Sequence, residues 1–79
     1  MAKKGPPTFG ERLKALREGE GLSQRELAGR ADVPLSRVFK LEQGQENDPR
    51  WSTVCKLAAG LGVSVAAFAG EDYATPGDR

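Results

Sequence analysis

The stretch of sequence that decides the fold is "LSQRELAGRADVPLSRVFKLEQG", residues 22–44. Ser23 and Glu26 have the spacing of a capping box, in which each side chain bonds to the backbone N–H of the other residue, so a helix is predicted to begin here. Asp32 follows in a tight turn, where aspartate tolerates a left-handed backbone better than most residues. Pro34 suits the first turn of a second helix. The stretch therefore predicts two short helices joined by a turn of about three residues.

The second of these helices carries two kinds of apolar residue. At about 100° per residue, Val38 and Leu41 share one side, which is predicted to face inward. Leu35 and Phe39 lie on a flank, where a small domain usually exposes polar groups to water. The stripe that points outward is polar and comprises Ser36, Lys40 and Gln43, with Arg37 on the opposite flank.

The rest of the chain has the periodicity of further short helices, the first of which follows a second capping box at Thr8 and Glu11. We predict an all-α, compact five-helix domain with no strand, because helices this short are unstable alone and must pack on one another. The helices are expected over residues 9–18, 23–30, 34–44, 52–60 and 64–68. Residues 1–8 are expected to form a flexible basic arm, 9–69 the folded domain and 70–79 a flexible tail.

Composition limits the classes of function. The 79 residues include no histidine and a single cysteine, Cys55, so an internal disulfide is excluded and a reducing, cytoplasmic setting is expected. Without histidine the usual general base and metal ligand are missing, and the carboxylates form no pair suited to acid–base chemistry. We therefore expect no enzymatic activity, no metal and no cofactor. No apolar run approaches the ~20 residues that span a membrane, and the basic start lacks the apolar run of a signal peptide.

Charge is distributed unevenly along the chain. Residues 1–40 carry nine Lys or Arg against five Asp or Glu, whereas residues 41–79 carry three against six. This asymmetry indicates that the first half could face a polyanion, although a randomly charged surface would explain the charges equally well. Lys3 and Lys4 could follow a duplex or enter its minor groove, or they could belong to a disordered leader.

The stretch 22–44 resembles the helix-turn-helix of the Cro/CI-type (XRE-type) family of phage repressors and small bacterial regulators. The later stretch "PRWSTVCKLAAGLGVSVAAF", residues 49–68, resembles the pair of helices that follows it in that family. The resemblance covers Phe9 to Phe68 and implies a lambda-repressor-like DNA-binding domain. It also implies that the second helix of the motif is the recognition helix, which lies in the major groove of DNA.

The resemblance implies a set of DNA-contacting residues. The expected base contacts are Leu35, Ser36, Arg37, Phe39 and Lys40. Lys40 or Arg37 would donate to guanine, and the apolar ridge formed by Leu35 and Phe39 would pack on thymine methyl groups. Alternatively, these two side chains fold back against the preceding helix or the following loop. Phe39 departs from the family, in which a small or polar residue is usual at this position.

Contacts to the DNA backbone are expected on both sides of the recognition helix. Gln24 matches the family position that contacts a phosphate at the start of a helix, and it could instead be a solvated capping residue. The full set of expected phosphate contacts is Gln24, Arg25, Gln43, Gln45, Asn47 and Arg50. Glu46 and Asp48 would be repelled by phosphates unless they point away, so non-specific binding is expected to be weaker than that of a strongly basic family member.

Two further expectations concern assembly and stability. The resemblance implies a structural ion pair between Arg17 and Glu42. A homodimer is expected to present two recognition helices to a palindromic operator of double-stranded DNA. The candidates for its interface are Trp51, Val63, Val65 and Phe68.

The predicted function is that of a sequence-specific transcriptional regulator, a repressor or autoregulator. The alternative is a protein-interaction module, such as an adaptor or an antitoxin that binds a toxin.

Overall fold

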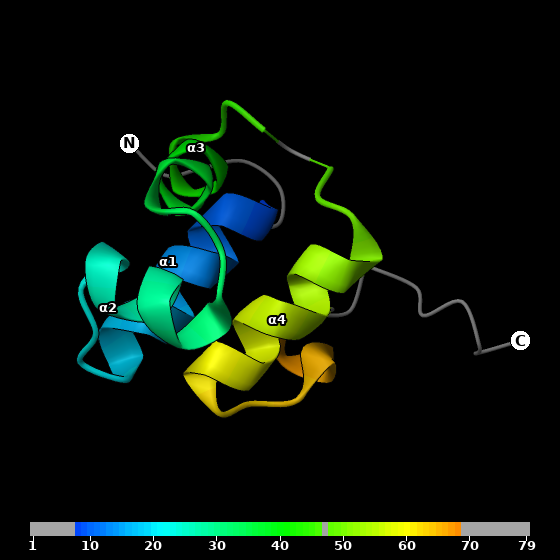
Figure 1. The fold of residues 1–79 in the computed structure, drawn as a ribbon. Helices are drawn as coiled ribbons and strands as arrows, with labels where there is room; N and C mark the ends of the chain where they lie inside the picture. Colours follow the sequence, from blue (N-terminus) through cyan, green and yellow to red (C-terminus); the bar gives the residue numbers. More distant parts are fainter. Residues whose placement is uncertain (1–7, 47, 69–79) are drawn as a thin grey trace, which may run out of the picture.

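The computed structural model describes residues 8–46 and 48–68, and in this part of the chain it confirms the all-α class, with no strand. The predicted tail, almost all of the predicted arm and Asn47 lie outside the described residues. None of the described helices is long and apolar enough to cross a membrane. The elements, in chain order, are α1 (Phe9–Gly19), α2 (Gln24–Ala31), α3 (Leu35–Gln43), α4 (Trp51–Leu61) and the 3-10 helix η1 (Val65–Phe68) (Figure 1).

The prediction of five α-helices was wrong, because the described residues form four α-helices and one 3-10 turn. Within the last segment the N–H of Ala67 bonds to the carbonyl of Ser64, three residues earlier, at 3.0 Å. The Ser64 hydroxyl also accepts the N–H of Ala66, at 3.0 Å. These short-range bonds hold the four residues in the tighter helix, which is common in pieces of this length.

Both predicted capping boxes are present. At the start of α2, Ser23 Oγ accepts the N–H of Glu26 at 3.0 Å, and the Glu26 carboxylate accepts the N–H of Ser23 at 2.8 Å. Thr8 and Glu11 make the same reciprocal pair at the start of α1. Asp32 ends α2 in the left-handed conformation, with φ 59° and ψ 46°, as the sequence predicts. Side-chain caps therefore fix where α1 and α2 begin, and the left-handed Asp32 fixes where α2 ends.

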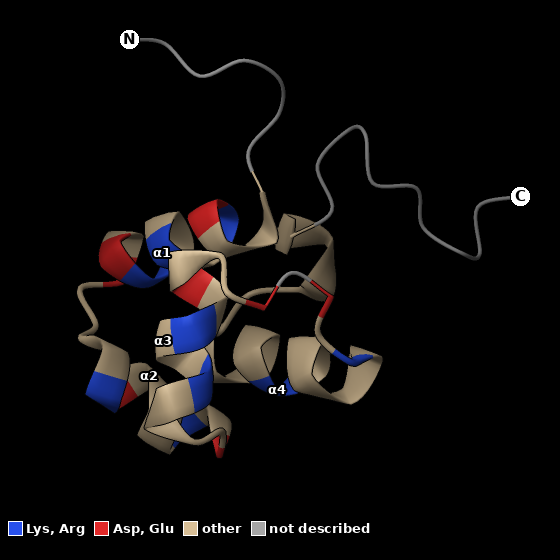
Figure 2. Cartoon of the chain, turned by 90° about the horizontal axis from the view of Figure 1, so that it is seen from above, with Lys and Arg blue, Asp and Glu red and all other residues tan. Residues whose placement is uncertain are grey.

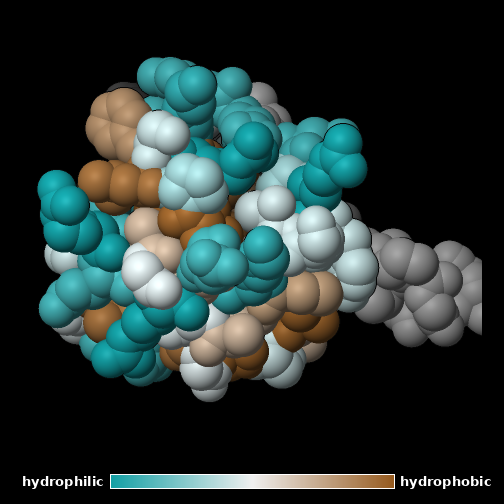
Figure 3. Space-filling view, in the orientation of Figure 1, coloured by the Kyte–Doolittle hydropathy of each residue, from teal (hydrophilic) through white to brown (hydrophobic). Residues whose placement is uncertain are grey.

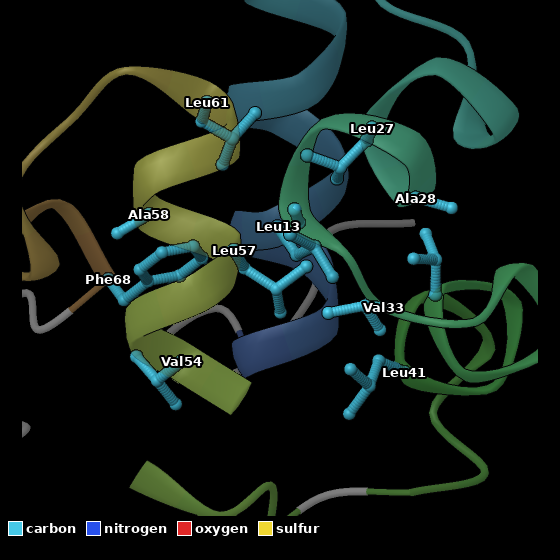
Figure 4. Close-up of a cluster of buried hydrophobic side chains, with 12 residues drawn as sticks. Leu13, Leu27, Ala28, Val33, Leu41, Val54, Leu57, Ala58, Leu61 and Phe68 are labelled. Atoms are coloured by element: carbon cyan, nitrogen blue, oxygen red, sulfur yellow. The ribbon is translucent and has the colours of Figure 1, made fainter. Parts of the chain in front are cut away.

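The core lies between the helices rather than under any single one. Figure 4 shows Leu13 from α1, Leu27 from α2, Leu41 from α3 and Leu57 from α4 converging on the same interior. Each of these four side chains is fully buried, and burying a leucine contributes roughly 1.5–3 kcal/mol to folding. Because every α-helix supplies one of them, the position of α3 depends on the whole domain.

The helix contacts leave one side of α3 open. α3 packs on α1 and on α2, whereas α4 packs on α2 and on η1. In Figure 1, α3 is seen nearly end-on at the upper left, with α4 on the opposite side of the molecule. η1 closes the far end of the core, where the rings of Phe9 and Phe68 stack with centroids 4.9 Å apart. The fold thus holds α3 against the domain by one face only.

Candidate nucleic-acid interface

The two faces of α3 differ in burial as the sequence predicts. Val38 and Leu41 are completely buried. The opposite stripe is exposed and consists of Ser36, Lys40 and Gln43. Hydroxyl, ammonium and amide groups on one exposed helical face can all bond to base edges or phosphates. α3 therefore presents a polar face that its own fold does not use.

Leu35 and Phe39 remain accessible at the edge of this face. Leu35 is 36% exposed and Phe39 is 45% exposed, so neither is buried against α2 or the loop that follows α3. Figure 3 shows apolar side chains at the position of α3, surrounded by hydrophilic ones. An exposed apolar pair beside polar groups is suited to a surface that carries both methyl groups and hydrogen-bonding groups, as the major groove does.

A buried polar network ties α3 to α1 and to the start of α2. The Glu42 side chain is only 2% exposed. One of its oxygens accepts Arg17 Nε at 2.7 Å, and the other accepts an Arg17 terminal nitrogen at 3.0 Å. The remaining terminal nitrogen of Arg17 donates to the carbonyl of Leu22 at 2.7 Å. The bidentate pair supports the ion-pair assignment of Arg17 and Glu42 and fixes the angle between α1 and α3.

The Arg17 guanidinium keeps its charge in this setting. The hydrogen bonds that Arg17 donates to Glu42 raise the pKa of Arg17 above its ordinary value, burial lowers that pKa, and the negative charges of Glu42 and Glu18 raise it further. Because the pKa is raised, the stabilisation that depends on charged Arg17 is fully present at neutral pH and is lost only in strongly basic solution. The ion pair is a permanent part of the fold.

Gln24 belongs to the same network, a contact that the sequence did not suggest. Its side-chain nitrogen donates to the Glu42 carboxylate at 3.0 Å, and the residue is half-buried. A glutamine amide has two donor hydrogens, so one is held by Glu42 and the second can serve a ligand at the start of α2. Arg25, the next residue, is exposed.

The loop after α3 contains both basic and acidic side chains. Gln45, Asp48 and Arg50 are exposed. Figure 2 shows basic segments on α2 and α3, and acidic segments in the loop between α3 and α4. Glu46 does not point away as a free carboxylate, because it accepts a hydrogen bond from Arg37 at 2.5 Å. Arg37, one of the predicted base-contacting residues, is therefore hydrogen-bonded to another side chain of the protein.

The residues predicted for a dimer interface differ in accessibility. Trp51 is 56% exposed, whereas Val63 and Val65 are half-buried against the core. Phe68 is 3% exposed and lies in the chain's own core, stacked on Phe9, so it is unavailable to a partner in this conformation. Phe68 therefore contributes to the core, and the exposed Trp51 is the interface candidate that a partner copy could reach.

The sequence pattern of a known domain family, the helix-turn-helix domain, matches residues 8–69 of this chain. The chain belongs to the XRE-type helix-turn-helix family of DNA-binding proteins. It is 37% identical over 65 residues to the immunity repressor protein of Bacillus phage phi105, covering 82% of this chain and 44% of the repressor. It is 36% identical over 56 residues to the HTH-type transcriptional repressor RghR of Bacillus subtilis, covering 71% of this chain and 42% of RghR. The chain thus spans less than half the length of these two relatives.

Solved structures show the same fold. The restriction-modification controller protein C.AhdI from Aeromonas hydrophila superimposes with a TM-score of 0.72 at 35% identity, over 76% of this chain and 89% of C.AhdI. SinR, the master regulator for biofilm formation, was solved in complex with DNA. It superimposes with a TM-score of 0.74 at 33% identity, over 77% of this chain and 97% of that one. The family and these relatives are DNA-binding regulators rather than enzymes.

Proposed function

We propose that this protein is a sequence-specific transcriptional regulator, a repressor or autoregulator, that inserts α3 into the major groove of double-stranded DNA. The observation that carries the proposal is the exposed outer face of α3, whose polar stripe and apolar ridge are left unused by a domain that buries the opposite face completely. Membership of a DNA-binding family and likeness to repressors support it. Such a regulator would act in the cytoplasm.

In this proposal the residues of α3 divide the work of base recognition. Lys40 donates to guanine acceptors, Ser36 bonds to either kind of base pair, and the ridge formed by Leu35 and Phe39 packs on thymine methyl groups. Arg37, on the half-exposed flank of α3, would reach a phosphate at the edge of the groove in place of the guanine contact expected from the sequence. The backbone is held by Gln24 and Arg25 at the start of α2 and by groups after α3, for which the candidates are Gln43, Gln45, Asn47 and Arg50.

We further propose that the protein binds as a homodimer. A single domain of this size offers few contacts to one half-site, whereas a two-fold dimer places two recognition helices about 34 Å apart on a palindrome. The candidates for the interface are the exposed Trp51 at the start of α4 and the partly buried Val63 and Val65 that follow its other end.

A binding selection from random duplex DNA, repeated at two salt concentrations, tests the function directly. We expect an enriched palindrome whose half-sites are about ten base pairs apart. Absence of any enriched sequence would favour the second candidate, a protein-interaction module such as an antitoxin or adaptor. The exposed ridge of Leu35 and Phe39 is the observation that supports that candidate.

Substitutions at two positions should separate base reading from backbone binding. Lys40→Ala is expected to change base preference, with a loss of about 1–3 kcal/mol on the selected sequence. Gln24→Ala is expected to weaken binding to all sequences alike. Competition titrations with the selected duplex and single-base variants measure both effects. If neither substitution altered DNA affinity, the assignment of α3 to the groove would be wrong.

A further inference from the structure

Arg37 and Glu46 form an ion pair at the edge of the proposed DNA surface. A terminal nitrogen of Arg37 donates to the Glu46 carboxylate at 2.5 Å, and the two side chains are 41% and 30% exposed. Arg37 projects from the flank of α3, next to the exposed Ser36 and one turn before the exposed Lys40. An ion pair this exposed contributes little to stability. Its position beside the outward face of α3 means that it can instead affect how Arg37 meets DNA.

The backbone holds Glu46 in place for this contact. Gly44 ends α3 in the left-handed conformation, with φ 81°. The N–H groups of Gln45 and Glu46 then both bond to the carbonyl of Lys40, at 2.9 and 3.3 Å. The carboxylate is thus carried on a segment that is fixed to the end of the recognition helix, rather than on an unanchored loop.

We propose that Glu46 limits the sequence-independent part of DNA binding, because its carboxylate withholds Arg37 from DNA phosphates. This inference rests on the proposed DNA-binding function. Arginine contacts to phosphate supply affinity without sequence information. A carboxylate that occupies the guanidinium weakens such contacts on every duplex, whereas base contacts from Lys40 and Ser36 remain. Affinity for every duplex is therefore lower, and discrimination between sequences is left to the base contacts.

The expected effect follows from the salt dependence of one phosphate contact. Releasing Arg37 should add about one contact, which makes the slope of log affinity against log salt steeper by roughly 0.9. Between about 1 M salt, where such a contact adds almost nothing, and about 0.15 M salt, this change in slope makes non-specific binding roughly fivefold tighter. Affinity for a selected operator should rise by a similar factor, because the added phosphate contact carries no sequence information.

The test is a fluorescence anisotropy titration of a random-sequence duplex pool over a range of salt concentrations. The variants are Glu46→Gln, Arg37→Gln and the double substitution, compared with the unaltered protein. Asp48→Asn is the matched control, since it removes one negative charge from the same loop at an exposed position with no ion-pair partner among the described residues. Thermal unfolding checks that every variant is folded.

The results separate a specific role of Glu46 from its charge alone. We expect Glu46→Gln to tighten binding by roughly fivefold, Asp48→Asn to have a smaller effect, and the gain from Glu46→Gln to vanish when Arg37 is also replaced. Equal effects of Glu46→Gln and Asp48→Asn, or a gain that persists without Arg37, would overturn the inference while leaving DNA binding intact. If neither the unaltered protein nor Glu46→Gln showed salt-dependent binding, the proposed function would fail together with the inference.

Discussion

Replacing Glu42 with alanine is expected to leave much of the protein unfolded at room temperature. The substitution removes the acceptor of two Arg17 hydrogen bonds and one from Gln24, while the arginine stays buried. Removing one partner of a buried ion pair costs about 3–5 kcal/mol, and a domain of this size rarely has more than about 3–5 kcal/mol of stability in total. Urea unfolding followed by circular dichroism measures the loss.

Glu18 provides the control on the same arginine. Its carboxylate lies 3.9 Å from Arg17, but its side chain is 58% exposed, so Glu18→Ala should change stability by less than about 1 kcal/mol. The double substitution Arg17→Met with Glu42→Leu should recover part of the stability, because no buried charge is left without a partner. If Glu42→Ala cost no more than Glu18→Ala, water would have to satisfy the arginine, and the network would not hold the helices together.

Features that depend on neighbours in the sequence were predictable. The capping box of Ser23 and Glu26 needs only residues three apart, and the left-handed turn at Asp32 is a local backbone preference. The faces of α3 follow from helical periodicity, so the burial of Val38 and the exposure of Lys40 agree with the sequence analysis. The same local rules miss the 3-10 geometry at the end of the domain, because four residues carry too little periodicity to distinguish the two helix types.

Features that depend on tertiary contact were not predictable from pattern alone. The bond from Gln24 to Glu42 joins two helices whose relative angle the sequence does not state. The contact between Arg37 and Glu46 depends on how the chain leaves α3, so the sequence indicated a carboxylate that repels phosphate but not the partner of Arg37. The stacking of Phe68 on Phe9, which lies at the opposite end of the folded sequence, could not be seen from the local pattern around either residue.

Gly10 marks a close approach of α1 and α3 that its sequence context does not reveal. A Cβ atom at Gly10 would lie 2.1 Å from the carbonyl oxygen of Leu41 and 3.3 Å from the Cα of Glu42. Both atoms belong to the backbone, so no side-chain rotation relieves the clash and the helices must separate. Gly10→Ala is expected to cost about 3 kcal/mol or more, at the upper end of the range for overpacked cores. Thermal unfolding should show a fall in Tm of more than about 10 °C.

Gly29 makes this prediction specific to the helix contact. It lies within α2, is exposed, and a Cβ atom there would meet nothing within 4 Å. Gly29→Ala should therefore stabilise the protein by about 0.4–1 kcal/mol, because alanine restricts the unfolded chain and favours the helix. The same chemical change thus has opposite signs at the two sites. A similar Tm for both variants would mean that α1 and α3 lie farther apart in solution than the 2.1 Å between the Gly10 Cβ position and the Leu41 carbonyl oxygen implies. α1 would then not hold α3 at a fixed angle to the rest of the domain.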